Sequence, residues 1–97
     1  MSAVAEHELD PHEFDKTDDM AMVTWLKMRG LTPQVIRWEG PKCFWYFDKS
    51  EFYMQSVDEF RQRRASVEPR EYNRIFRMTK AEFYDAMPEQ RERRDGR

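Results

Sequence analysis

Apolar side chains fill most positions of the stretch MAMVTWLKMR, which begins at residue 20 and is followed by Gly30. A segment that is apolar around most of its circumference predicts a helix that other elements contact on more than one side. We expect Thr17 to cap this helix, with Asp18 and Asp19 placed favourably in its first turn. Gly30 suits the left-handed position that ends a helix.

Two later stretches, PQVIRWE and KCFWYF, are rich in β-branched and aromatic residues and flank the sequence EGPK. This pattern predicts a β-hairpin. Gly40 supplies conformational freedom for the turn. Because Gly-Pro is not the usual pair in a two-residue hairpin turn, we expect a longer loop.

A second helix is predicted from either Asp48 or Ser50, as rival caps, to about Ala65. A third helix begins near Pro69, a residue suited to a first turn, and ends before Pro88. One face of the third helix is apolar and is expected to reach the core: Tyr72, Ile75, Phe76, Thr79, Phe83, Ala86 and Met87. Phe76→Ala should therefore cost about 3–5 kcal/mol.

The chain of 97 residues is long enough for one domain. We predict an α+β fold of the order helix–β-hairpin–helix–helix (αββαα) over residues 17–88. Residues 1–16 show no hydrophobic periodicity and are expected to be a flexible acidic arm. Residues 89–97 are expected to be a polar basic tail. Residues 1–19 carry a local charge of −6 and residues 61–97 one of +4. The two ends could partly neutralise each other, or the basic end could meet an acidic partner.

The predicted hairpin holds four aromatic residues in a row, although the mean hydropathy of the chain is −1.02. Side chains alternate along a strand, so Phe44 and Tyr46 point one way while Trp45 and Phe47 point the other. Three outcomes are open: helices cover both faces, the hairpin pairs with a second copy in a homodimer, or one face binds a partner such as unstacked bases. We expect more rings than the three helices can cover, and assign Trp38, Phe44 and Tyr46 to a protein-binding or dimer surface.

A second candidate surface lies opposite the core face of the third helix. Four basic residues and one tyrosine share it: Arg70, Arg74, Arg77, Lys80 and Tyr84. A solvated face would explain them, but three of the four bases are arginine, whose planar fork suits phosphates and carboxylates. The face is therefore a candidate site for nucleic acid or an acidic partner. Arg61, Arg63 and Arg64 could extend it or complement the end of the second helix.

Residues with catalytic or metal-binding potential are sparse. His7 and His12 are the only histidines, and the chain has three glycines, so it contains no Gly-rich phosphate loop. We predict no enzyme, no catalytic residues, no metal and no cofactor. The single Cys43 cannot form an internal disulfide and reads as a small buried side chain, which favours a cytoplasmic location. No apolar run approaches the length of a membrane helix, and the N-terminus lacks the features of a signal peptide.

Three stretches resemble a family of short phage and bacterial proteins that share a domain of unknown function. TDDMAMVTWLKMRGL is similar to the opening helix of that family, FWYFDKSEF to its strand end that leads into a helix, and VEPREYNRIFRMTKAEFY to its closing helix. The similarity covers residues 17–84. It implies an α+β fold and an origin in a mobile element, with host cytoplasm as the location, and it implies no activity.

The leading hypothesis is a small non-enzymatic interaction protein that binds and modulates a host or phage protein. The alternative is a nucleic-acid-binding accessory protein that uses the arginine-rich face of the third helix. The net charge of −2 counts against this alternative, although a local basic stripe can outweigh it.

Overall fold

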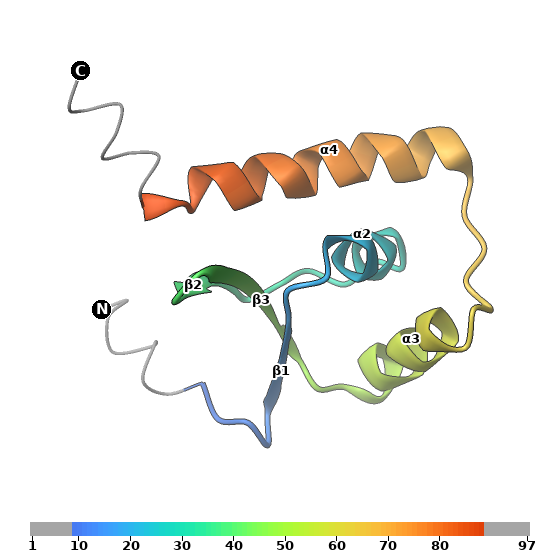
Figure 1. Cartoon of the computed structure of the whole chain (residues 1–97). Coiled ribbons are helices and arrows are strands. Elements are labelled where there is room, and N and C mark those ends of the chain that lie inside the picture. The colour runs from blue at the N-terminus through green and yellow to red at the C-terminus, as the bar shows by residue number, and fades with distance from the viewer. Residues whose placement is uncertain (1–8, 89–97) are drawn as a thin grey trace.

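The computed structural model describes residues 9–88. It has a three-stranded antiparallel sheet of order β1-β3-β2 and three helices, so the chain is a small α+β domain (Figure 1). The first eight residues, which belong to the predicted arm, and the predicted basic tail lie outside the described residues. In chain order the elements are β1 (Phe14–Thr17), α2 (Met20–Met28), β2 (Val35–Glu39), β3 (Lys42–Asp48), α3 (Glu51–Arg61) and α4 (Pro69–Asp85).

The predicted hairpin is confirmed as β2 and β3, but its loop is shorter than expected. Glu39 pairs with Lys42, which leaves Gly40 and Pro41 as a two-residue turn. Gly40 has a φ of +64°, and proline has a fixed negative φ. A positive φ followed by a negative φ is the combination of a type II′ turn, which matches the twist of a hairpin.

The first strand was not predicted. Residues 14–16 were assigned to the flexible arm, whereas Phe14–Thr17 form β1 and pair with the free side of β3, from Phe14 opposite Asp48 to Thr17 opposite Trp45. Since Thr17 belongs to a strand, it does not cap the first helix. Asp19 does so instead, and its carboxylate accepts hydrogen bonds from the backbone of Ala21 (3.0 Å) and Met22 (3.3 Å).

The other two helices begin where local capping residues allow. Ser50 rather than Asp48 caps α3, since its hydroxyl accepts the N–H of Tyr53 at 3.0 Å. Pro69 occupies the first turn of α4, as predicted, and Glu68 caps that helix. Helix α3 ends at Arg61, before the predicted Ala65, because the chain turns through Arg63 at a φ of +60°.

The core lies where α2 meets the sheet, and α2 lies between α4 and α3 (Figure 1). Trp25 of α2 donates a buried hydrogen bond to the carbonyl of Ser56 in α3 at 2.8 Å. On the other side, Lys27 of α2 forms a 2.7 Å ion pair with Glu82 of α4. The nearly all-round apolar pattern of α2 is explained by these neighbours. The buried apolar cluster comprises Met22, Val23, Trp25, Leu26, Cys43, Trp45, Phe47, Tyr53 and Val57.

Helix α4 turns its predicted apolar face inward, but that face is unevenly buried. Thr79 is fully buried, and the ring of Phe83 packs on Trp38 with centroids 5.1 Å apart. Nearer the start of α4, Phe76 stacks on Tyr72 at 6.2 Å, is only partly buried and lies outside the core cluster. Its truncation should therefore cost less than the sequence suggested. None of the helices within residues 9–88 is long and apolar enough to cross a membrane.

Candidate functional site

The face of the sheet that the helices cover holds two of the four consecutive hairpin rings, Trp45 and Phe47. Trp45 is fully buried, and Phe47 is 1% exposed. Trp45 Nε1 donates to Glu82 Oε1 at 3.1 Å, and Phe47 stacks on Tyr53 of α3 with centroids 5.6 Å apart. Tyr53 in turn donates from its hydroxyl to Asp15 of β1 at 2.7 Å. These rings are structural and are not available to a partner.

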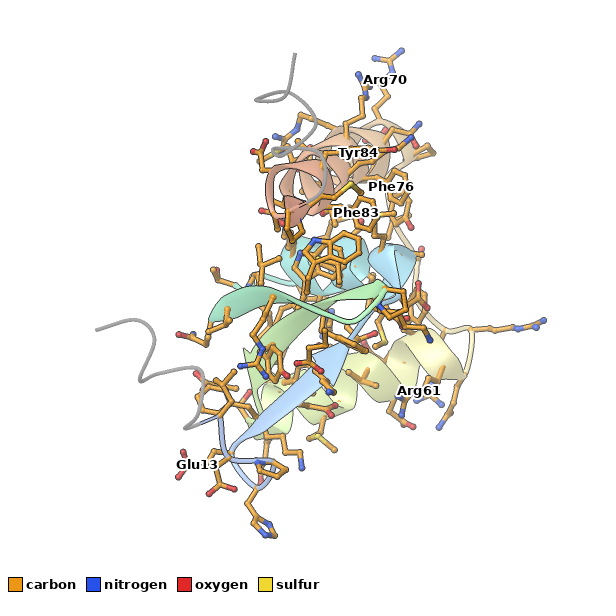
Figure 2. The ribbon with its side chains drawn as sticks, turned by 60° about the vertical axis from the view of Figure 1, so that its left-hand side comes forward. Glu13, Arg61, Arg70, Phe76, Phe83 and Tyr84 are labelled. Atoms are coloured by element: carbon orange, nitrogen blue, oxygen red, sulfur yellow. The ribbon has the colours of Figure 1, made fainter. Side chains whose placement is uncertain are left out.

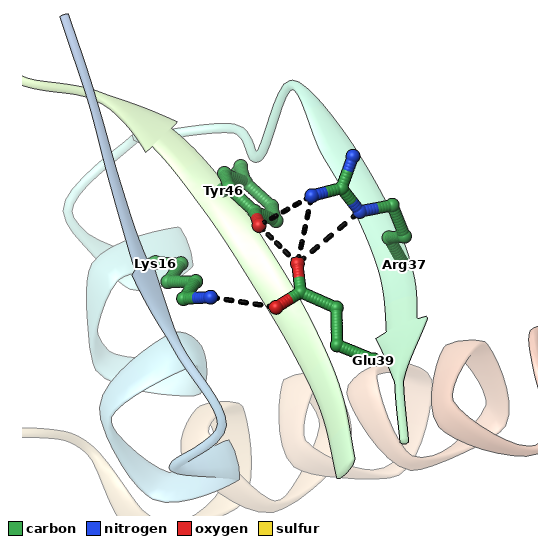
Figure 3. Close-up of polar contacts among 4 residues, drawn as sticks. All are labelled: Lys16, Arg37, Glu39 and Tyr46. Atoms are coloured by element: carbon green, nitrogen blue, oxygen red, sulfur yellow. Dashed lines mark hydrogen bonds and ion pairs between the residues drawn. The ribbon is translucent and has the colours of Figure 1, made fainter. Parts of the chain in front are cut away.

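Polar side chains of the sheet itself cover the opposite face (Figure 3). Glu39 on β2 accepts from Lys16 on β1 at 2.6 Å, from Arg37 at 2.8 Å and from the hydroxyl of Tyr46 on β3. The Tyr46 hydroxyl also accepts from Arg37 at 2.8 Å. We call these four residues, Lys16, Arg37, Glu39 and Tyr46, the sheet network.

The sheet network lies directly over aromatic rings. The Nζ atom of Lys16 is 4.5 Å from the ring centroid of Phe44, and the guanidinium of Arg37 is 5.0 Å from that of Tyr46. Cations in this position are attracted to the ring face. Tyr46 is only 6% exposed, and Lys16 and Arg37, which lie over its ring, both belong to the sheet.

The electrostatics of the sheet network favour an ionised Glu39 and a neutral Tyr46. Hydrogen bonds from Lys16 and then from Tyr46 lower the pKa of Glu39 from 4.5 to about 2. Burial, with a smaller effect of the bond to Glu39, raises the pKa of Tyr46. The Glu39 carboxylate thus offers an acceptor to each of its three donors, and this arrangement stabilises the sheet rather than presenting an open reactive group.

The expectation was that the hairpin has more rings than the three helices can cover. The helix-covered face buries Trp45 and Phe47, whereas Tyr46 lies on the opposite face and is buried with Lys16 and Arg37 of the sheet over its ring. Of the four consecutive rings, Phe44 alone is left partly exposed. The prediction counted only helices as cover. It missed the sheet network because Lys16 was assigned to the arm and because Lys16 and Glu39 are far apart in sequence.

Trp38, Phe44 and Tyr46 do not form one surface. In the β2–β3 register Trp38 is opposite Cys43, whereas Phe44 is opposite Arg37 and Tyr46 is opposite Val35. Residues that face each other across a ladder share a side of the sheet. Trp38 therefore lies on the helix-covered side against Phe83, and its indole Nε1 is buried without a hydrogen-bond partner in the described part of the chain.

The outward face of α4 is the surface that remains open. Figure 2 shows Arg70 projecting away from the sheet, whereas Phe83 lies on the side of α4 that faces it. Arg70, Arg74, Arg77 and Lys80 are all exposed, and Tyr84 is 45% exposed. The structure thus brings together all five residues that the sequence assigned to this face, and we call them the α4 surface.

Within residues 9–88, most cations of the α4 surface have no acidic partner. Arg74 pairs with Glu71 at 2.6 Å, one helical turn away. Arg70, Arg77 and Lys80 have no carboxylate of the described chain within ion-pair distance. Because exposed arginines keep their full set of donors for a ligand, this face can bind carboxylates or phosphates.

Two features of this region were not predicted. Met78 is 51% exposed, and its sulfur lies 3.7 Å from a guanidinium nitrogen of Arg74, so it adds apolar area to the margin of the α4 surface. Of the three arginines suggested as an extension, Arg61 lies on α3, and Figure 2 shows it well apart from Arg70. Arg63 and Arg64 follow α3 and are not part of α4. A helical-wheel count extended by one position would have found Met78, whereas the position of Arg61 depends on tertiary structure.

Comparison with protein-family models, with curated proteins and with solved structures finds no match to this chain. Within residues 9–88, no three His, Cys, Asp or Glu side chains are grouped so that they could hold a metal ion.

Proposed function

We propose that this protein is a small non-enzymatic binding protein that recognises an acidic patch on a protein partner through the α4 surface. The observation that carries the proposal is the exposure of Arg70, Arg77 and Lys80 without a carboxylate partner in residues 9–88. Arginine forks form paired hydrogen bonds with carboxylates, so an acidic protein surface complements this face.

The surroundings of these cations favour a protein over a nucleic acid. Tyr84 and Met78 add exposed apolar area, and Arg, Tyr and Met are the residue types enriched at protein interfaces. Glu71 and Asp85 stand on the same helix, and the net charge of the chain is −2. These negative charges oppose a nucleic acid more strongly than a bounded acidic patch, because duplex DNA carries one negative charge about every 1.7 Å along its whole axis.

The resemblance to short phage and bacterial proteins guides the search for the partner. We propose a host or phage protein whose activity is modulated when the α4 surface covers its acidic patch. A tagged chain would be used to capture partners from a bacterial lysate, and each captured protein would then be purified and titrated directly against the untagged chain.

The decisive comparison uses two matched pairs of charge reversals. Arg70→Glu with Arg77→Glu should weaken binding of the purified partner by about tenfold or more, because partner carboxylates would then face like charges. Lys42→Glu with Arg61→Glu changes the net charge equally, away from the α4 surface, and should leave affinity nearly unchanged. An equal loss in both pairs, or no loss in either, contradicts the proposal.

Nucleic-acid binding is the second candidate, supported by four bases and Tyr84 on one helical face. Binding to labelled single-stranded and double-stranded DNA across a salt series tests it. A steep loss of binding with salt that Arg74→Glu and Arg77→Glu abolish would favour this candidate. Absence of binding at low salt excludes it.

We do not extend the proposal to a hairpin homodimer. Strand β2 is an edge strand and could in principle pair with a second copy. However, it is only five residues long, and its Glu39 is bound within the sheet network. We expect a monomer by light scattering at high concentration, and a dimer would overturn this expectation.

A further inference from the structure

The segment between α3 and α4 contains a residue in a backbone conformation that its type disfavours. Arg63 has a φ of +60° and is the one non-glycine residue within 9–88 with a positive φ. Its N–H bonds the carbonyl of Phe60 at 3.1 Å, and the N–H of Arg64 bonds that of Glu59 at 2.8 Å, a helix ending at which glycine is usual. Glycine would adopt this backbone conformation at lower cost than arginine. The presence of Arg63 here therefore indicates that its side chain has a role.

The residues after Arg63 are open to solvent and free of regular structure. Residues 64–68 belong to no helix or strand. Ser66 is exposed and Val67 is 37% exposed. Neither the backbone N–H nor the hydroxyl of Ser66 bonds any group in the described chain. An enzyme could therefore draw this segment into its cleft without breaking a helix or a strand.

Two arginines precede Ser66 and an apolar residue follows it, and this is the pattern that arginine-directed serine kinases recognise. We propose that Ser66 is a phosphorylation site for a serine kinase that recognises arginines two and three residues before the acceptor. Arg64 and Arg63 occupy these positions, and the apolar Val67 follows the serine. Kinases select substrates by charge pattern, and carboxylates in their clefts would pair with the two guanidinium groups.

Both arginines are accessible for this recognition. Arg63 is exposed and has no side-chain partner in the described chain. Arg64 makes an exposed ion pair with Asp58 at 3.6 Å and a bond to Gln62. Exposed pairs of this kind are weak, so a kinase carboxylate can replace Asp58 at little cost.

The proposed reaction uses MgATP. The Ser66 Oγ attacks the γ-phosphorus, the new Oγ–P bond forms as the bond to the β-phosphate oxygen breaks, ADP leaves, and the hydroxyl proton passes to a base of the kinase. The product carries a dianionic phosphate two residues before Glu68, the cap of α4. The positive end of the helix dipole and the adjacent arginines favour a phosphate there, whereas Glu68 opposes it.

The test uses the folded full chain, MgATP and the catalytic subunit of cyclic-AMP-dependent protein kinase as an arginine-directed probe. We expect one phosphoryl group by intact mass, mapped to Ser66, at a rate comparable to that of a free peptide of residues 61–68. Ser66→Ala should abolish incorporation. No incorporation, incorporation that persists in Ser66→Ala, or incorporation only after heat unfolding would each overturn the proposal.

Arg63→Gly separates recognition from folding, because glycine accepts the same backbone conformation more readily than arginine. We expect this variant to fold at least as well as the parent and to be phosphorylated about tenfold more slowly or worse, as expected for the loss of a recognised charge pair. Lys42→Gln, on β3 and outside the recognised positions, should leave the rate unchanged. Equal rates for the parent and Arg63→Gly would contradict the assignment.

Discussion

The Nζ atom of Lys16 lies 2.6 Å from the Oε1 atom of Glu39 and thereby links the two edge strands across β3. The same nitrogen stands 4.5 Å from the centre of the Phe44 ring. One lysine thus ties β1 to β2 and covers an aromatic side chain between them. Charged side chains of the strands thus cover aromatic rings on the face of the sheet opposite the helices.

Replacing this lysine tests the arrangement. Lys16→Met should lower the free energy of unfolding by about 0.5–1 kcal/mol, the range of a partly exposed ion pair with a cation–π contact. Lys80→Met removes an equal charge from an exposed position without an ion pair in residues 9–88 and should have almost no effect. Chemical denaturation of both variants provides the measurement, and equal losses would refute the structural role of Lys16.

Acid pH should weaken the same network through Glu39. Its folded-state pKa is depressed from 4.5 to about 2, mainly by the hydrogen bond from Lys16. A depressed carboxyl pKa contributes stability that is fully present above pH 4.5 and is lost as the pH falls toward 2. Glu39→Gln lacks this contribution, so the stability difference between parent and variant should shrink over that window. A difference that stays constant with pH would rule out the assignment.

The single thiol should be unreactive in the folded protein. Cys43 is 2% exposed, and burial, with a smaller effect of Glu82, raises its pKa to about 11. The thiolate is the reactive form, and it is both scarce at neutral pH and inaccessible. A colorimetric thiol reagent should modify Cys43 only after denaturant is added. Rapid modification of the native chain would show that the helix-covered face of the sheet opens readily.

Two aromatic truncations should differ, although the sequence placed Phe76 on the core face of its helix and left the cover of Trp45 open. Trp45→Ala removes a fully buried ring that donates to Glu82, and should cost about 3–5 kcal/mol. Phe76→Ala removes a partly buried ring that stacks on Tyr72, and should cost about 1–2 kcal/mol. Thermal and denaturant unfolding would rank them. A larger loss for Phe76→Ala would contradict the packing of α4.

Glycine at the end of α3 should stabilise the chain. Arg63→Gly relieves the cost of a left-handed arginine and should raise the free energy of unfolding by about 0.5–1 kcal/mol. Gln62→Gly, one residue earlier at a φ of −90°, relieves no such cost and should bring no gain. Calorimetry would measure the free energy of unfolding of both variants. A loss of stability in Arg63→Gly would mean that the arginine side chain itself stabilises the turn.

Much of the α4 surface could be predicted, because the regular spacing of a helix determines which residues of the sequence share one face. Arg70, Arg74 and Arg77 fall on one side of any helix that starts at Pro69. The hairpin surface could not be predicted in the same way. Trp38 belongs to the opposite face from Phe44 because of the strand register, which the length of the turn sets.

Local patterns in the sequence by themselves determined the three helices, the hairpin and the orientation of α4, since caps, prolines and hydrophobic spacing act over a few residues. Tertiary structure alone decided that Phe14–Thr17 would form a third strand and that Lys16 would meet Glu39. A four-residue strand is too short to show a period, and its partner strand lies about thirty residues away in the sequence. Such contacts form only when the sheet is assembled. The sequence alone therefore could not show that Lys16 and Arg37 lie over the rings of Phe44 and Tyr46.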